Sequence, residues 1–213
     1  MNGQRLPITC VLIDNGGVLL SDGWNHITRR TVTDHFNLDY DEVDQRHQTN
    51  VAIYEEGKLS IDEYLRRVVF YEDRAFSPGE FQQFMFDQSA PYLEMISCMK
   101  QLKAQYGLTV VVLSNEAREM NAHRISKFGL NTFVDTFVSS CLVHLRKPDE
   151  AIFRLAIDVV VTPLEQIVYI ENTPLFVDIM GALGVRSILH RDWESTAAVL
   201  AEMGLSLRDT FQI

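Results

Sequence analysis

The sequence has few positively charged residues. Its 213 residues include 19 lysines and arginines against 29 aspartates and glutamates, which gives a formal net charge of −10. Nucleic-acid-binding proteins concentrate basic residues to displace counterions from phosphates, and no basic stripe with interleaved aromatic residues occurs here. Nucleic acid is therefore excluded as an expected partner. The same balance disfavours anionic substrates unless local cationic groups or a bound metal ion offset it.

Cysteines and long apolar runs are also scarce. The three cysteines, Cys10, Cys98 and Cys141, have neither disulfide-framework nor zinc-site spacing, so we expect buried, unpaired thiols in a reducing compartment. No apolar run approaches the ~18 residues that span a bilayer, so we expect no membrane partner. The apolar stretch from Ile8 to Ile13 is too short for a secretory signal, and we expect a cytoplasmic protein.

The sequence does contain short apolar runs that alternate with helical patterns. Their continuous Val, Ile and Leu character is typical of strands buried on both faces of a parallel sheet. The runs are Thr9–Ile13, Thr109–Leu113, Thr136–Ser139, Ile167–Ile170 and Arg186–Leu189. Strands that alternate with helices predict an α/β fold with a doubly wound, mainly parallel, Rossmann-like sheet.

Helices between these strands are predicted from their caps. Gly129 and Gly184 suit the left-handed residue that follows a helix, and Pro174 suits a first turn. The segment Thr162-Pro163-Leu164-Glu165 has the sequence of a capping box and predicts a further helix start. The other predicted helices are Pro91–Tyr106, Glu116–Phe128, Asp149–Val160 and one that begins at Thr173-Pro174.

Residues 21–91 break this alternation, because they contain helical patterns and no convincing strand. Ser60 and Ser77 each begin a capping-box sequence. The predicted helices are Asn25–Phe36, Asp41–Glu56, Ser60–Asp73 and Ser77–Gln88. Helices this short form a small bundle. We therefore predict an α/β core made of residues 1–20 and 92–213, with a helical bundle inserted at residues 21–91.

Polar residues stand where the predicted strands end, the positions that border the ligand crevice of an open parallel sheet. They are Asp14-Asn15-Gly16-Gly17, Ser114-Asn115, Lys147-Pro148 before a helix, and Glu171-Asn172-Thr173. A hydroxyl and an amide at a helix N-terminus suit a phosphate oxygen, and an ammonium group neutralises an anion. Each motif alone is more often a turn or a helix cap. Their occurrence in order indicates a catalytic site.

These motifs resemble those of the haloacid dehalogenase superfamily over nearly the whole chain. The superfamily's first motif, an apolar strand followed by Asp-x-Asp-Gly-(Thr/Val)-Leu, is matched by the segment that runs from Asp14 to Leu19. The second, an apolar strand ending in Ser or Thr, is matched at Ser114, and the third, Lys-Pro, at Lys147. One large branch has a helical cap after the first motif. The chain most resembles sugar-phosphate phosphatases whose first motif reads Asp-x-Gly-Gly-Val or Asp-x-Gly-Asn-Val.

The resemblance implies a hydrolase of small phosphomonoesters such as sugar phosphates. Asp14 would attack phosphorus and form an aspartyl-phosphate, which water then hydrolyses. Ser114 and Lys147 would be catalytic with Asp14, because phosphoryl transfer depends on positioning and on electrostatic stabilisation. The residues expected beside the phosphate are Asn15, Gly16, Ser114, Asn115 and Lys147.

The resemblance also implies Mg²⁺, and two residues at the expected metal site depart from the family pattern. The ion would be held by Asp14, the backbone carbonyl of Gly16 and the pair Glu171-Asn172. Gly16 replaces an acid-base Asp, a loss of about 10²–10⁴ in rate, although the branch with Gly here is understood to include working phosphatases. Asn172 replaces a carboxylate, so we expect weaker Mg²⁺ binding.

Two alternatives stay open. One is a catalytically impaired protein that binds phosphate or a metabolite, because Gly16 and Asn172 replace acids. The other is dehalogenase-like chemistry, in which Asp14 displaces a halide without metal; that branch usually has Tyr where this chain has Gly16. Oligomeric state has no signature in the sequence. Weaker site candidates, more often explained as solvated or paired residues, are Trp24, His26, Arg29, Arg118, His123, His144 and Arg146.

Overall fold

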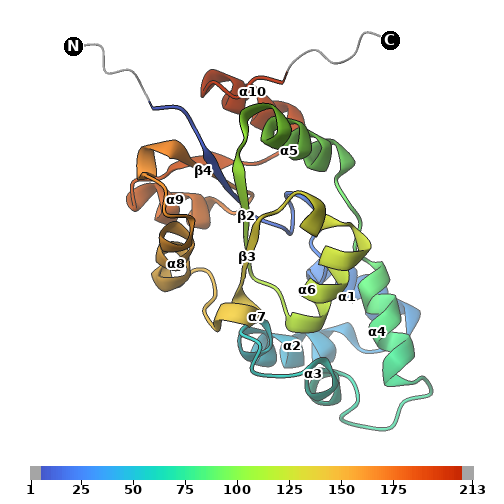
Figure 1. The fold of residues 1–213 in the computed structure, drawn as a ribbon. Coiled ribbons are helices and arrows are strands. Elements are labelled where there is room, and N and C mark those ends of the chain that lie inside the picture. Colours follow the sequence, from blue (N-terminus) through green and yellow to red (C-terminus); the bar gives the residue numbers. More distant parts are fainter. Residues whose placement is uncertain (1–5, 208–213) are drawn as a thin grey trace, which may run out of the picture.

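A sheet of five parallel strands forms the centre of the computed structural model, which describes residues 6–207 (Figure 1). The strands are β1 (Cys10–Ile13), β2 (Thr109–Ser114), β3 (Thr136–Ser139), β4 (Ile167–Glu171) and β5 (Arg186–Leu189), in the spatial order β3-β2-β1-β4-β5. In the register, Ile13 of β1 pairs with Val112 of β2 and Ile170 of β4, so these strands end together. The predicted α/β class and parallel sheet are confirmed.

Alternate residues of β1 pack into different layers. Val11 and Ile13 contact the cluster that includes α5 (Leu93–Tyr106) and α10 (Trp193–Glu202). Leu12 contacts the cluster that includes α8 (Glu150–Val160) and α9 (Pro174–Ala182). Figure 1 shows these two pairs of helices on different sides of the sheet. Burial on both faces explains why the strands are continuously apolar.

The helices α1 (His26–His35), α2 (Tyr40–Glu55), α3 (Ile61–Val68) and α4 (Pro78–Asp87) lie between β1 and α5 in the chain. They share an apolar cluster of their own that includes Tyr64 and Phe81. Ala117 and Met120, at the start of α6 (Arg118–Lys127), belong to the same cluster. The helical segment is therefore packed against the part of the molecule that follows the carboxyl end of β2 (Figure 1).

The two connections between this helical segment and the sheet lie side by side. Leu20 and Pro91 form an antiparallel bridge. The amide of Ser21 donates to the carbonyl of Ala90 at 2.8 Å, and the amide of Tyr92 donates to the carbonyl of Leu19 at 2.9 Å. The chain thus enters and leaves residues 22–89 through one two-stranded crossing.

Helix caps account for most of the predicted boundaries. Both capping boxes, at Ser60 and Ser77, are present with reciprocal side-chain and backbone hydrogen bonds. The helix predicted to reach Asp73 ends instead at Val68, because Phe70 and Phe76 turn inward and contact each other with ring centroids 5.6 Å apart. The remaining short elements are η1 (Leu130–Thr132), α7 (Ser140–Val143) and η2 (Leu164–Gln166).

Two other helix expectations differ from the structure. The capping box at Thr162 is wrong, because its hydroxyl donates to the carbonyl of Val160 at 2.9 Å and only the single 3₁₀ turn η2 follows. Helix α10 was not predicted from the sequence. Its cap is Asp192, whose side chain accepts from the amide of Ser195 at 2.7 Å.

Two expectations drawn from composition concern thiols and membranes. All three cysteines are buried and unpaired, as expected. Burial raises the pKa of Cys10 to about 12 and those of Cys98 and Cys141 to about 11. No helix within residues 6–207 combines the length and the apolar character needed to cross a membrane.

The turn after α2 supplies a test of the packing between the helical segment and the sheet. Gly57 has φ +68°, and a Cβ at this position would lie 2.3 Å from the carbonyl oxygen of Cys141. Gly57→Ala should therefore lower the free energy of unfolding, measured with urea, by about 2 kcal/mol or more. Gly79→Ala is the matched control, because a Cβ there contacts nothing within 4 Å. Equal stability of the two variants would contradict this close contact.

Candidate active site

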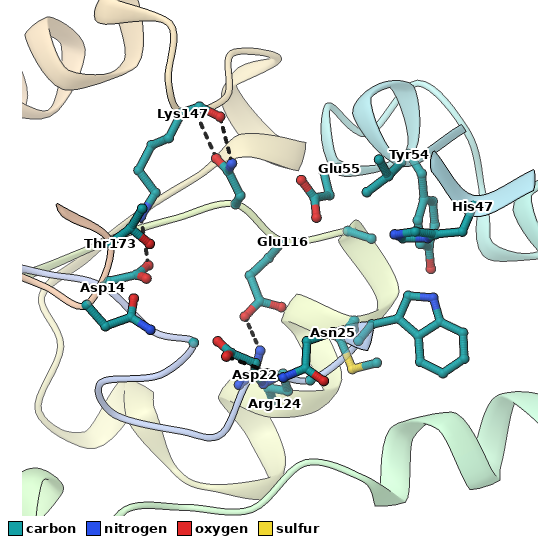
Figure 2. Close-up of a pocket in the computed structure, with 18 of the residues that line it drawn as sticks. Asp14, Asp22, Asn25, His47, Tyr54, Glu55, Glu116, Arg124, Lys147 and Thr173 are labelled. Atoms are coloured by element: carbon teal, nitrogen blue, oxygen red, sulfur yellow. Dashed lines mark hydrogen bonds and ion pairs between the residues drawn. The ribbon is translucent and has the colours of Figure 1, made fainter. Parts of the chain in front are cut away.

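A cavity of about 290 Å³ opens where β1, β2 and β4 end, between the sheet and the helical segment (Figure 2). From the sheet side it is lined by Asp14, Gly16, Asn115, Glu116, Lys147 and Asn172. From the helical segment and its connection it is lined by Asp22, Trp24, His47, Tyr54, Glu55 and Met85. The predicted strand-end motifs therefore meet at one cavity.

Lys147 stands between two carboxylates at the base of this cavity. Its Nζ lies 3.0 Å from Oδ1 of Asp14 and 2.7 Å from Oε2 of Glu171. It also donates to the carbonyl of Leu113 at 3.2 Å. The Lys147 and Glu171 side chains are 2% and 0% exposed, so this ion cluster is almost free of solvent screening.

Burial and charge act in opposite directions within the cluster. Burial raises the pKa of Asp14 to about 7, although the nearby Lys147 ammonium works to lower it. Burial also disfavours the charged form of Lys147, but Asp14 and Glu171 outweigh it and raise the pKa of the ammonium group. Lys147 therefore stays charged.

Neighbouring groups hold the cluster in place. The amide of Asn115 forms two bonds with the backbone of Lys147: its Oδ1 accepts from the Lys147 amide at 2.8 Å, and its Nδ2 donates to the Lys147 carbonyl at 2.9 Å. The Tyr169 hydroxyl donates to Oε2 of Glu171 at 2.6 Å. Oε1 of Glu171 accepts from the amides of Asn172 and Thr173, each at 3.0 Å. Both oxygens of Glu171 are thus engaged by protein donors.

A second buried ion pair, which was not predicted from the sequence, borders the same cavity. Arg124 of α6 pairs with Glu116 and also donates to the carbonyl of Ser21. Asn15 donates to the same Glu116 oxygen at 2.9 Å. Glu116 directly follows the Ser114-Asn115 motif, so its position beyond a strand end was the available signal. Arg124 carries no such signal, because its role depends on how α6 packs.

Comparison with known proteins assigns the chain to a family. A sequence model of the haloacid dehalogenase-like hydrolases matches residues 8–183. The chain belongs to the haloacid dehalogenase-like hydrolase family. No curated protein matches this member significantly.

Solved structures share the fold of this haloacid dehalogenase-like hydrolase. A HAD family enzyme from Bacteroides thetaiotaomicron, in complex with magnesium and inorganic phosphate, is similar with a TM-score of 0.72 at 15% identity, over 89% of this chain and 98% of that one. A predicted HAD-like family hydrolase from Porphyromonas gingivalis has a TM-score of 0.71 at 18% identity, over 92% of this chain and 98% of that one. An L-2-haloacid dehalogenase from Xanthobacter autotrophicus has a TM-score of 0.61 at 15% identity, over 93% of this chain and 84% of that one.

The remaining predicted site residues of this family member are divided between the cavity lining and the buried layer behind it. Gly16 and Asn172 line the cavity. A Cβ on Gly17 would lie 2.0 Å from Nδ2 of Asn172, so the amide of Asn172 fills space that only glycine leaves open. Asn15 points to Glu116. Ser114 is 1% exposed, and its hydroxyl has no hydrogen-bond partner within residues 6–207.

The weaker candidates are mostly engaged by other protein groups. Arg29 pairs with Asp44 at 2.6 Å, and Arg146 pairs with Glu55 at 2.6 Å. Trp24 differs, because it lines the cavity. His26 is exposed at the start of α1, the His144 ring bonds the carbonyl of Glu56, and Arg118 donates to the carbonyl of Cys141. His123 lies against Phe86, outside the cavity lining.

A chain of hydrogen bonds fixes the indole of Trp24. Its Nε1 donates to the Tyr64 hydroxyl at 2.7 Å, and that hydroxyl is 2.7 Å from Nδ1 of His47. Because the Tyr64 oxygen already accepts from Trp24, its hydrogen is available for a neutral His47. Burial, with a smaller contribution from the charge of Arg29, lowers the pKa of His47 to about 3.

This pKa shift predicts a pH dependence of stability. The unfolded chain protonates His47 below about pH 6.5, but the folded chain does not until about pH 3, so its contribution is complete above 6.5 and is lost as the pH falls. As the pH falls from 6.5 to about 3, the free energy of unfolding of the unaltered chain should decrease more than that of His47→Gln. The difference should be up to about 1.4 kcal/mol per pH unit. His26→Gln, on an exposed residue, is the control. Parallel curves for the chain and His47→Gln would contradict a neutral buried His47.

Proposed function

We propose that this hydrolase is a Mg²⁺-dependent phosphatase of small phosphomonoesters such as sugar phosphates, with Asp14 as nucleophile. The observation that carries the proposal is the carboxylate of Asp14 at the cavity, fixed through Oδ1 by the buried Lys147. A fixed carboxylate beside a permanent positive charge suits attack on a phosphoryl group. The similar Bacteroides enzyme in complex with magnesium and inorganic phosphate supports the same chemistry.

The reaction proceeds in two displacements at phosphorus. An oxygen of Asp14 bonds to phosphorus while the bond from phosphorus to the alcohol oxygen breaks, and the alcohol leaves after taking a proton. Water then adds its oxygen to phosphorus and gives up a proton, the bond to Asp14 breaks, and inorganic phosphate departs. Lys147 remains charged beside Asp14 and stabilises the negative charge of the transferred group. Asn115 orients Lys147 through its backbone.

The cavity offers oxygen donors that suit Mg²⁺. They are the carboxylate of Asp14, the carbonyl of Gly16 and the side-chain amide of Asn172, whose residues all line the cavity. Both oxygens of Glu171 already accept from protein donors, so Glu171 adds negative charge near the site by pairing with Lys147. Across residues 6–207 no three His, Cys, Asp or Glu side chains form a metal-binding cluster. When bound, Mg²⁺ neutralises charge on the phosphate.

The helical segment supplies the other wall of the cavity. We propose that residues 21–91 act as a cap over an α/β core of residues 1–20 and 92–213, and that the cap screens substrates. Trp24, His47, Tyr54 and Met85 support this role, because they line the cavity opposite the strand ends.

Replacement of the nucleophile tests the proposal. Asp14→Asn should reduce hydrolysis of a phosphomonoester panel, assayed with and without Mg²⁺, by about three orders of magnitude or more. Its unfolding curve should match or exceed that of the unaltered chain, because the amide removes a buried charge. Asp34→Asn, an exposed carboxylate on α1, is the matched control. Full activity in Asp14→Asn, or halide release from 2-chloropropionate without any phosphatase activity, would overturn the assignment.

A non-catalytic phosphate-binding protein is the second candidate. The observation that favours it is the absence, within residues 6–207, of a free second carboxylate at the expected metal position, where Asn172 stands and Glu171 is engaged.

Restoring a carboxylate separates the two candidates. Asn172→Asp should tighten Mg²⁺ binding, measured by calorimetry, by about tenfold or more and should preserve or raise turnover. Asn131→Asp, an exposed site, should leave Mg²⁺ affinity unchanged. Tighter Mg²⁺ binding without turnover of any ester, in either the variant or the unaltered chain, would favour the binding protein.

A further inference from the structure

The cations that line the cavity are already matched by carboxylates. Lys147 is shared by Asp14 and Glu171. Arg124 pairs with Glu116, with both side chains almost completely buried. The lining residue Glu55 has its own partner outside the lining set, since Arg146 donates to it through two nitrogens, at 2.6 and 3.1 Å. None of these three cations is left to neutralise a second anionic group on a bound molecule.

Asp22 adds an exposed carboxylate to the cavity, and no ion pair of Asp22 is found within residues 6–207. It lines the cavity on the connection that leads to α1, and its Oδ1 lies 3.2 Å from the place that a Cβ on Gly16 would take. Its one hydrogen bond found within residues 6–207 is a long one of 3.4 Å from Nδ2 of Asn25. Figure 2 shows Asp22 below Glu116 and next to Asn25, with its carboxylate on the side of Asp14. A negatively charged substituent placed there would be repelled.

The far wall is flat and contains an unused hydroxyl. Trp24 is fixed by its bond to Tyr64, and Tyr54 stacks on Tyr64 with ring centroids 4.0 Å apart and planes 8° apart. Tyr54 is 2% exposed and lines the cavity, but its hydroxyl has no hydrogen-bond partner in the described residues. A buried hydroxyl without a partner costs free energy that a ligand with a hydroxyl group recovers.

We propose that this cavity selects phosphate monoesters of uncharged, hydroxyl-bearing alcohols and rejects esters whose alcohol carries a second anionic group. Asp22 and Tyr54 are the specificity-determining residues: Asp22 repels an anion and accepts from hydroxyls, and Tyr54 bonds a hydroxyl. The phosphate occupies the end of the cavity at Asp14 and Lys147, and the alcohol lies against Trp24. This inference rests on the proposed function for the placement of the phosphate.

Two esters that differ at one group test the selection. Glycerol 3-phosphate has a CH₂OH group where 3-phosphoglycerate has a carboxylate, and the two esters are otherwise the same. Their Kd values are measured by calorimetry with Mg²⁺ on Asp14→Asn, which prevents turnover during the titration. Glycerol 3-phosphate should bind about tenfold more tightly. Adding Asp22→Asn should reduce this ratio about fivefold by strengthening 3-phosphoglycerate binding, and adding the matched Asp34→Asn should leave it unchanged.

The Tyr54 hydroxyl is tested with a third ester. Tyr54→Phe should weaken glycerol 3-phosphate about fivefold and leave methyl phosphate, which has no hydroxyl on its alcohol, unchanged. Equal affinities for the two glycerol-based esters, tighter binding of 3-phosphoglycerate, or a ratio that Asp22→Asn does not move would overturn the inference.

Turnover by the unaltered chain keeps this result separate from the proposed function. Ester hydrolysis without the preference overturns the inference alone. If the chain shows this binding preference but hydrolyses no ester, the proposed phosphatase function is overturned and the proposed selectivity of the cavity stands. Binding of none of the esters overturns both.

Discussion

A single ammonium group shared by two buried carboxylates determines the arrangement of this site. Removing charges from water is costly, and the cost is offset only when geometry and hydrogen bonding are complete. Lys147 meets this condition through Asp14, Glu171 and the Leu113 carbonyl. The pairing in turn requires β1, β2 and β4 to end at the same level, as their register ensures. The parallel sheet and the ion cluster therefore depend on each other.

Charge at the cavity is compatible with the anionic substrate proposed for this acidic chain. The net charge of −10 is a property of the whole sequence, whereas a phosphate group meets local charges. At the strand ends the permanent positive charge of Lys147 faces Asp14, whose pKa is raised to about 7 by burial. Farther along the cavity the carboxylates of Glu116 and Glu55 are neutralised by Arg124 and Arg146. The global charge is thus a poor guide to this pocket.

Much of the fold was predictable because the signals were local. Apolar runs predicted every strand, and Ser60 and Ser77 predicted helix starts, since caps depend on three or four adjacent residues. The meeting of Asp14 with Lys147 was expected from Asp14 at a strand end, from Lys147 just before a helix, and from the family resemblance. Contacts set by packing were not predictable: Arg124 reaches Glu116 because α6 has one particular orientation. The capping box at Thr162 failed because its hydroxyl bonds the carbonyl of Val160 and only one 3₁₀ turn precedes the strand β4.

The paired crossing at Leu20 and Pro91 has an evolutionary consequence. Because the outgoing and returning chains are hydrogen bonded to each other, the sheet experiences the whole helical segment as a single short hairpin. Because these two points are fixed to each other, a change in the length of residues 22–89 does not by itself require the strands to shift register. Under the proposed division into core and cap, chemistry and recognition lie on opposite sides of this crossing, so the two can diversify separately.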